Sequence, residues 1–368
     1  MHCNKDGALR SSSYELKNIA QQIKETTNGF NLQSSQSLFH PLENKIFIPM
    51  KSNKIIAALA AIVSVSLAQT PIDPPLPSYK KTSGVSGILN SIGSDTMNNL
   101  LTFWAEEFKE FYPNVKIQVE GKGSSTAPPA LIAQTAQLGP MSRQMKDIEI
   151  DQFENSFGYK PAVFRVAIDA IAIYVNLDNP LRSLTMKQVD AIFSSTRRGG
   201  GLYDISLWRQ LGLAGIWSHR TISLYGRNSA SGTYGYFKEH ALFKGDFKSA
   251  VKEQPGSGSV VHAITQDRDA IGYAGIGYIT SGVRALSLKM NNADKPVELS
   301  VQTALSGEYP LSRFLYIYIN KKSNESPDPL VREFMKFILS KEGQRMVVKD
   351  GYLPLPTKIV EEELEKLK

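Results

Sequence analysis

The chain has 368 residues, of which 42% are hydrophobic and 21% are charged, and a formal net charge of +7 at pH 7. This balance is typical of a soluble globular protein, and the length is sufficient for two domains. A lone cysteine, Cys3, excludes an intrachain disulfide and a cysteine-based zinc site, and the five histidines lack metal-ligand spacing. No Lys/Arg run or basic–aromatic alternation accompanies the basic excess, so we expect no nucleic acid as a partner. We also expect no metal and no cofactor.

The N-terminal region carries a targeting pattern. Residues 1–49 are polar and weakly patterned, which predicts disorder. After Met50 come a basic segment, an apolar run and a small-x-small ending, an order typical of a secretory signal peptide and too short to span a membrane well. We therefore expect a signal peptide at 50–68, translation from Met50, a non-native extension before it, and a secreted mature protein. A genuine N-terminal extension with an internal anchor is the alternative.

The following segments predict a linker and then alternating strands and helices. Residues 69–84 are rich in proline and polar residues, as in an extended linker. Residues 88–92 predict a strand, and apolar residues at helical spacing over 97–111 predict a helix with Ser94 as its N-cap. Residues 115–119 alternate like a second strand.

Hydroxyl-rich loops follow this strand. Ser124, Ser125 and Thr126 precede two prolines, which are favoured in the first turn of a helix, and that helix is expected to continue to about Ala136. Residues 137–143 predict a short strand that ends in Ser-Arg.

The second half of the chain continues the alternation. In the long β-rich run 163–175, Asp169 interrupts an otherwise apolar segment and therefore needs a partner. The glycines of 270–278 lack the lysine or acidic ribose partner of a nucleotide loop. Strands alternating with helices predict an α/β fold with largely parallel sheets. The other expected elements are a capped helix over 185–194, a strand over 314–319, helices over 328–339 and 342–348, and a charged, solvated helix or tail over 358–368.

One stretch has the composition of an anion-binding loop. A strand over 221–225 leads into a helix that begins at Ser231, where unbonded N–H groups and a partial positive charge are expected. Ser231 and Thr233 add hydroxyls, Gly232 permits close approach of the backbone, and Arg227 adds a planar fork of donors. The stretch predicts a pocket for a small oxyanion. The alternative is an ordinary strand–turn–helix junction with a serine cap.

The motif Arg-x-x-x-Ser-Gly-Thr after a strand resembles the phosphate-binding loop of the PstS family, the periplasmic substrate-binding components of phosphate ABC importers. The resemblance extends over roughly 85–356, with further pieces in family order. These are Gly93-Ser94-Asp95-Thr96, Gly123-Ser124-Ser125, Met141-Ser142-Arg143, Ile168-Asp169-Ala170, Ala270-Ile271-Gly272-Tyr273, Tyr309-Pro310 and Tyr352-Leu353-Pro354.

The resemblance implies a two-lobed α/β periplasmic-binding-protein fold of type II. Each lobe would be a mixed, mostly parallel sheet flanked by helices, and crossing hinge strands would join the lobes around phosphate. Lobe I would comprise 85–167 plus 306–368, and lobe II would comprise 168–305.

The resemblance also implies the phosphate ligands. Arg227 is expected to be the main charge partner, bidentate to phosphate, with Arg143 as a second. The first lobe would contribute the Ser94 hydroxyl, the amides of Asp95 and Thr96, the Ser124 hydroxyl, its near equivalent Ser125 and the loop residue Ser142. The second lobe would contribute Arg227, Ser231, the Gly232 amide and Thr233.

One departure from the family concerns a carboxylate. Some members have an aspartate where this chain has Met141-Ser142-Arg143, and another branch has Ser-Arg there, so the identity of the carboxylate that accepts the phosphate proton is open. Asp169 is the first candidate, with a structural ion pair to Arg143 or Arg165 as the alternative. Asp95 is the second, although an acid in a first helical turn also has a structural explanation.

The resemblance implies a monomeric, non-catalytic clamp that closes on inorganic phosphate and delivers it to permease subunits of an ABC importer. The alternatives are a binding protein for another tetrahedral oxyanion, a secreted phosphatase, or a surface protein. A phosphatase would need a nucleophile with its base, or a two-metal carboxylate cluster, and the sequence offers neither.

Overall fold

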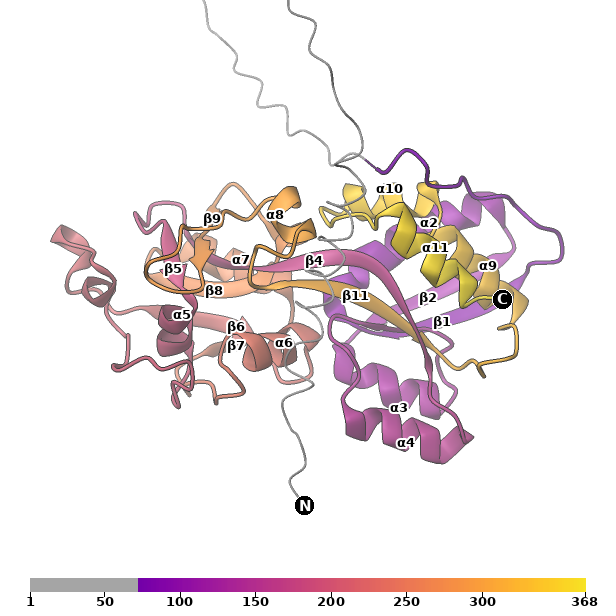
Figure 1. Ribbon diagram of the computed structural model, residues 1–368, viewed down its shortest axis with the longest axis horizontal. Helices are drawn as coiled ribbons and strands as arrows, with labels where there is room; N and C mark the ends of the chain where they lie inside the picture. The colour runs from indigo at the N-terminus through magenta and orange to yellow at the C-terminus, as the bar shows by residue number, and fades with distance from the viewer. Residues whose placement is uncertain (1–71) are drawn as a thin grey trace, which may run out of the picture.

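The computed structural model describes residues 72–368. The expected extension, the expected signal peptide and the first residues of the expected linker lie outside the described residues. Figure 1 shows two halves, which two long strands cross side by side. These strands, β4 (Ala162–Asn176) and β11 (Ser312–Ile319), pair antiparallel with Arg313 opposite Asp169.

Lobe I is the right-hand half of Figure 1, where the indigo and yellow parts of the described chain lie together. The parallel pair β1 (Gly87–Gly93) and β2 (Val115–Gly121) and the short β3 (Gly139–Met141) form its strands. Its helices are α2 (Asn98–Phe111), α3 (Ala127–Ile132), α4 (Asp147–Phe157), α9 (Pro329–Ile338), α10 (Lys341–Lys349) and α11 (Thr357–Glu365).

Lobe II is the left-hand half of Figure 1. Its strands are β5 (Ser183–Thr185), β6 (Ser223–Arg227), β7 (Lys252–Gln254), β8 (Ala270–Gly275), β9 (Val283–Ala285) and β10 (Ser287–Lys289). Its helices are α5 (Met186–Phe193), α6 (Gly232–His240), α7 (Ser257–Gln266) and α8 (Val301–Leu305).

A continuous sheet of order β3-β11-β4-β8-β6-β7, with β9 beside β4, extends through both lobes. The pairs β1–β2 and β6–β8, each within one lobe, are parallel, whereas the pairs of β4 and β11 with each other and with β3, β8 and β9 are antiparallel. The two-lobed α/β fold with mixed sheets is therefore confirmed. The exact lobe limits stay a prediction.

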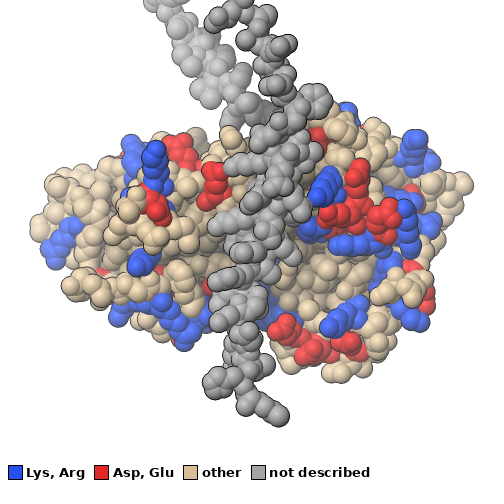
Figure 2. Space-filling model, viewed as in Figure 1, with Lys and Arg blue, Asp and Glu red and all other residues tan. Residues whose placement is uncertain are grey.

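The crossing strands also form the centre of the core. Every residue of β11 is buried, and β4 is buried from Val166 onward. Because the main apolar cluster includes both strands, it continues from one lobe into the other. Within residues 72–368, none of the helices has the length and apolar character to cross a membrane. Figure 2 shows acidic and basic side chains interspersed over both halves of the visible face.

Most predicted elements are present, with local corrections. Ser94 occupies the N-cap position of a 3₁₀-helix (Asp95–Met97) that precedes α2, but its side chain makes no capping hydrogen bond. The helix after the prolines ends at Ile132 rather than near Ala136, and Gln134 beyond it has a positive φ of 57°. Helix α4 was not predicted.

The two ends of the described chain are packed rather than free. The C-terminal helix α11 is not a solvated tail, since Ile359, Val360 and Glu363 are buried on one of its faces. Residues 72–84 contain neither helix nor strand, yet Leu76 is buried and the Tyr79 hydroxyl donates to Glu333 (3.1 Å).

Candidate anion-binding site

Loops from both lobes meet between the lobes. In lobe I, 3₁₀-helices follow β1 (Asp95–Met97) and β2 (Ser124–Thr126), and a loop with Ser142 follows β3. Parallel strands end at a common sheet edge, which brings the first two loops together, as at ligand sites of open α/β sheets. In lobe II, β6 ends at Arg227 and α6 begins at Gly232.

The start of α6 is built by local capping. The Ser231 hydroxyl accepts hydrogen bonds from the backbone N–H groups of Thr233 (3.1 Å) and Tyr234 (3.4 Å), which confirms Ser231 as the N-cap. Gly232 and Thr233 are buried at this helix start.

Arg227 enters the interlobe region from the end of β6 and is 1% exposed. Its Nη1 donates to Ser257 Oγ (2.7 Å), and its Nη2 donates to the Pro255 carbonyl (3.2 Å) and to Asp95 Oδ2 (2.9 Å) in lobe I. Burial lowers the pKa of Arg227, and the Asp95 carboxylate opposes that shift. The protein thus holds the Arg227 guanidinium by its two terminal nitrogens, Nη1 and Nη2.

The structure is that of a closed clamp. The hydroxyls of Thr96 and Thr233 lie 2.9 Å apart across the lobes, and the Ser125 N–H donates to the Ala230 carbonyl (3.1 Å). Gly232 lies so close to lobe I that an added Cβ would be 2.2 Å from Ser124 Oγ.

Two buried donors in this region have no partner within the described protein. They are the Ser94 hydroxyl in lobe I and Arg227 Nε in lobe II. Buried polar groups are nearly always hydrogen-bonded, so such a pair of exceptions needs an explanation. A small anion with several acceptor oxygens, held between the lobes, supplies one.

Sequence reasoning missed Arg313. This residue of β11 is 1% exposed and donates to Asp169 Oδ2, the Ser142 carbonyl and Thr233 Oγ1. The signal was an arginine directly before the apolar run 314–319, together with the lone aspartate in the other long strand. Only the strand register shows that the two face each other.

Comparison with known proteins identifies the family. A family model described as "PBP superfamily domain" matches residues 80–342. The phosphate-binding protein PstS of Pseudomonas aeruginosa is 56% identical over 86% of this chain and 99% of its own. The chain belongs to the PstS family.

Solved structures agree with this PstS assignment. A phosphate ABC transporter substrate-binding protein from Clostridium perfringens with bound phosphate is 26% identical, covers 73% of this chain and 100% of its own, and has a TM-score of 0.62. An ABC-type phosphate transport receptor from Vibrio cholerae, 21% identical with a TM-score of 0.56, covers 73% of this chain and all of its own and shows the same fold. The family is one of substrate-binding proteins, and this chain has that role.

In this PstS-family protein, contacts through Arg313 link four of the residues predicted from sequence: Ser124, Ser142, Thr233 and Asp169. Ser124 Oγ accepts from the Ser142 N–H (3.0 Å), and Arg313 connects Ser142 to Thr233 and Asp169. The full set predicted from sequence, whose role as phosphate ligands stays a prediction, is Ser94, Asp95, Thr96, Ser124, Ser125, Ser142, Arg143, Asp169, Arg227, Ser231, Gly232 and Thr233.

The ion pairs of Arg143 and Asp169 differ from the alternatives considered. Arg143 forms two 2.7 Å bonds to Glu149 and reaches Ser125 Oγ at 3.2 Å, so its charge is compensated within lobe I. Asp169 pairs with Arg313 rather than with Arg143 or Arg165, and Arg165 binds Glu363 instead. Burial raises the pKa of Asp169, and the Arg313 guanidinium acts in the opposite direction.

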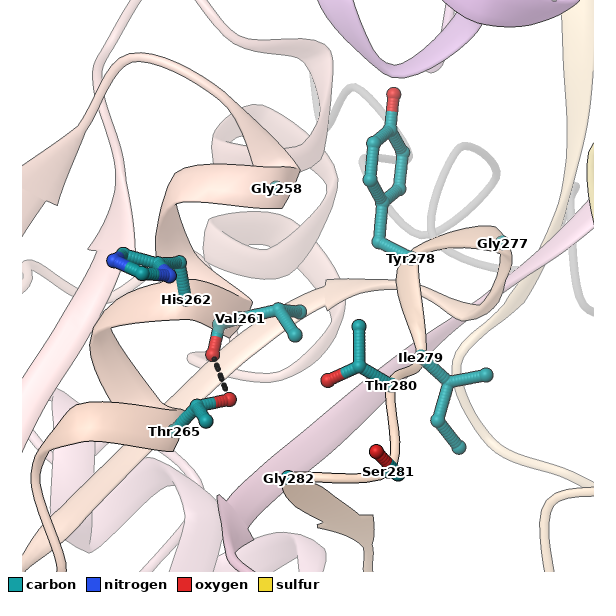
Figure 3. A pocket seen from close by; sticks show the side chains of 10 residues that line it. All are labelled: Gly258, Val261, His262, Thr265, Gly277, Tyr278, Ile279, Thr280, Ser281 and Gly282. Carbon is teal, nitrogen blue, oxygen red and sulfur yellow. Dashed lines mark hydrogen bonds between the residues drawn. The ribbon is translucent and has the colours of Figure 1, made fainter.

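A separate surface hollow of about 550 Å³ lies between α7 and the loop after β8 in this PstS-family protein (Figure 3). No lysine, arginine, aspartate or glutamate lines it, so it differs in chemistry from the interlobe site. Figure 3 shows the Tyr278 side chain pointing to a purple segment of the chain, and its hydroxyl donates to the carbonyls of Asp95 (3.4 Å) and Thr96 (3.3 Å). This tyrosine is a further contact between the lobes. Across 72–368 no group of three or more histidine, cysteine, aspartate or glutamate residues could hold a metal ion.

Proposed function

We propose that this protein binds inorganic phosphate between its lobes and delivers it to the permease subunits of an ABC-type importer. The observation that carries the proposal is the pair of unpartnered buried donors, Ser94 Oγ and Arg227 Nε, from opposite sides of the closed clamp. Phosphate has four oxygens, enough to accept from both lobes at once. The names of the P. aeruginosa and C. perfringens relatives support phosphate as that anion.

The mechanism is ligand-dependent closure. In the open state phosphate meets the donors of one lobe, and in the closed state it meets those of both. The ligand therefore binds the closed state more tightly and shifts the equilibrium toward it. The proposed ligands are hydroxyls, N–H groups and guanidinium groups, which hold an anion without attacking it. We therefore propose that the protein binds phosphate without catalysing a reaction.

The proposed contacts of Arg227 follow from its anchoring. Ser257, Pro255 and Asp95 already accept from its terminal nitrogens, while Nε has no partner. The bidentate contact expected from sequence would require Nη2 to share its hydrogens with the ligand. We therefore assign Nε as the primary donor from Arg227 to phosphate.

Two aspartates are candidates for the acceptor of the phosphate proton. Phosphate near neutral pH carries a proton that a carboxylate can accept, whereas sulfate carries none and is repelled. Asp169 is the candidate favoured by sequence, but its two oxygens accept from Arg313 and from the Ile276 N–H (3.2 Å). Asp95 uses Oδ2 for Arg227 and Ser257, which leaves Oδ1 as an acceptor, and its contacts thus favour Asp95.

Calorimetric titration of the purified, ligand-stripped protein with phosphate, arsenate and sulfate tests the function. We expect one phosphate per chain, competition by arsenate and rejection of sulfate. A protein that takes up sulfate or molybdate but not phosphate would support the other-oxyanion alternative. Turnover of a chromogenic phosphate ester would support the phosphatase.

The same titration tests the aspartates. The variant of the true acceptor, Asp95→Asn or Asp169→Asn, should lose discrimination against sulfate by about tenfold or more, because an unpaired buried group costs about 1–3 kcal/mol. The other variant serves as its control. Unchanged sulfate rejection in both variants would contradict an aspartate acceptor.

The location and assembly of the protein are proposed on sequence grounds. A periplasmic protein that begins after a signal peptide at 50–68 is checked by N-terminal sequencing of the secreted form, and a mature start before Lys51 would contradict it. A monomer is checked by sedimentation with and without phosphate.

A further inference from the structure

Arg313 lies where the two crossing strands and both lobes meet. It is on β11, opposite Asp169 of β4 in the strand register, and its side chain is 1% exposed. Packing alone seldom explains a buried arginine, because its charge and its five N–H donors all need partners.

The partners of Arg313 belong to three separate parts of the fold. Its Nε and Nη2 donate to Asp169 Oδ2 at 3.0 and 2.7 Å, which anchors the guanidinium to the neighbouring crossing strand. Its Nη1 donates to the Ser142 carbonyl of lobe I at 2.6 Å. Its Nη2 also donates to Thr233 Oγ1 at the start of α6 in lobe II, at 2.9 Å.

These contacts depend on lobe position. Ser142 and Thr233 lie in different lobes, so opening the clamp separates the two segments that the guanidinium joins. Arg313, fixed to Asp169 on the hinge, cannot follow both segments. The complete set of hydrogen bonds therefore exists in the closed state alone.

Arg313 also determines the orientation of a hydroxyl proton. The Thr233 hydroxyl has one hydrogen and two acceptor positions, and Arg313 fills one of the acceptor positions. The hydrogen must then point to another acceptor, either the Thr96 hydroxyl 2.9 Å away or an anion held between the lobes. A guanidinium that only donates thus favours Thr233 as a donor to the ligand.

We propose that Arg313 is a positioning residue that couples anion binding to lobe closure, acting through Thr233 and Ser142 rather than by touching the anion. The proposal rests on the proposed phosphate site. Asp169 compensates the charge of Arg313, so this arginine contributes geometry more than net charge and differs in that respect from Arg227. Asp169 acts as its anchor.

The decisive variant is Arg313→Lys, which keeps the positive charge and a partner for Asp169. A compact ammonium cannot place donors on Asp169, Ser142 and Thr233 together as the planar fork does. We expect the Kd for phosphate in calorimetry to rise about 10- to 100-fold, the range for losing a hydrogen bond to a charged group. X-ray scattering at saturating phosphate should show incomplete closure.

The matched control is Arg165→Lys on the other crossing strand. Arg165 also pairs with carboxylates, those of Glu362 and Glu363, but it makes no contact with the candidate ligands. The Kd of Arg165→Lys for phosphate should stay within about twofold of the wild-type value. Thermal unfolding of Arg313→Lys, measured in parallel, protects the test, because it shows whether a weaker Kd for phosphate comes from a folded variant.

A double-mutant cycle with Thr233→Val separates positioning from general stability. If Arg313 acts through Thr233, the losses of the two single variants should be clearly non-additive in the double variant. Provided that the wild type binds phosphate, either of two results would overturn the proposal. One is additive losses in the cycle, and the other is a Kd of Arg313→Lys for phosphate within about threefold of the wild-type value. A wild type that binds no phosphate would instead overturn the proposed function.

Discussion

Replacing Gly232 with alanine should prevent the clamp from closing completely. A Cβ added there would lie 2.2 Å from Ser124 Oγ, 2.5 Å from Ser142 Oγ and 2.9 Å from Ser124 Cβ. Ordinary contact begins at about 3.4 Å. Rotation of the two hydroxyls does not remove the clash, because Ser124 Cβ is also too close and must move.

The magnitude follows from the displacement. Restoring ordinary contact requires a shift of roughly 1 Å between α6 and the Ser124 loop. Such a shift takes a hydrogen bond out of its range of about 2.7–3.2 Å. Losing one or two hydrogen bonds to a charged ligand, each worth about 1.5–3 kcal/mol, gives a loss near 3 kcal/mol, or about 150-fold in Kd.

The assay is phosphate calorimetry with thermal unfolding measured in parallel. Gly232 is the first residue of α6, where alanine is compatible with the helix, so Gly232→Ala should keep its melting temperature while losing affinity. The matched control is Gly235→Ala on the same helix, where the nearest atom to an added Cβ is Arg143 Cδ at 3.1 Å and no atom of the Ser124 loop is close. Binding by Gly232→Ala within threefold of the control would refute the reasoning.

Three further outcomes can be measured. Ser94→Ala removes a buried hydroxyl without a protein partner, so ligand-free stability should not fall, whereas phosphate titration should show about tenfold weaker binding; a melting temperature lowered by several degrees would contradict this. Burial and the charge of Asp169 raise the pKa of Asp350 to about 7, so its contribution to stability is complete below pH 4 and is lost as the pH rises to 7. Asp350→Asn should therefore gain about 2 kcal/mol over wild type at pH 8 and little at pH 4 in denaturant unfolding, after allowance for its partial exposure; a pH-independent difference would point elsewhere. Glu363 is fully buried between Arg165 and Lys366, and Glu363→Gln should cost about 3 kcal/mol by leaving Arg165 underpaired, with no change in Kd for phosphate; an unchanged melting temperature would show that Glu362 suffices.

Local patterns could be predicted from the sequence because their physics is local. The Ser231 cap involves residues two and three positions apart, and the Thr185 capping box is closed by Gln188 three positions on. The loop from Arg227 to Thr233 has its donors within one short segment. Such interactions depend on spacing alone.

The ion-pair partners of residues that lie far apart in the sequence could not be predicted in the same way. Arg313 and Asp169 are 144 residues apart, and Arg227 and Asp95 are 132 apart. The sequence indicated that a buried aspartate needs a partner, but it suggested Arg143 or Arg165 and missed Arg313. The choice among them follows from the register of two strands, which a pattern of apolar residues does not define.

The two crossings of the chain between lobes impose an order on assembly. Lobe II is built from one continuous stretch between β4 and β11, whereas lobe I needs α9, α10 and α11 from the far end of the chain. During synthesis or export, lobe II can gain its packing while lobe I still exposes the apolar surface of α2 that α9 and α10 cover. Trp104, whose indole N–H donates to the Gly343 carbonyl 239 residues later, would report the last step of refolding by its fluorescence.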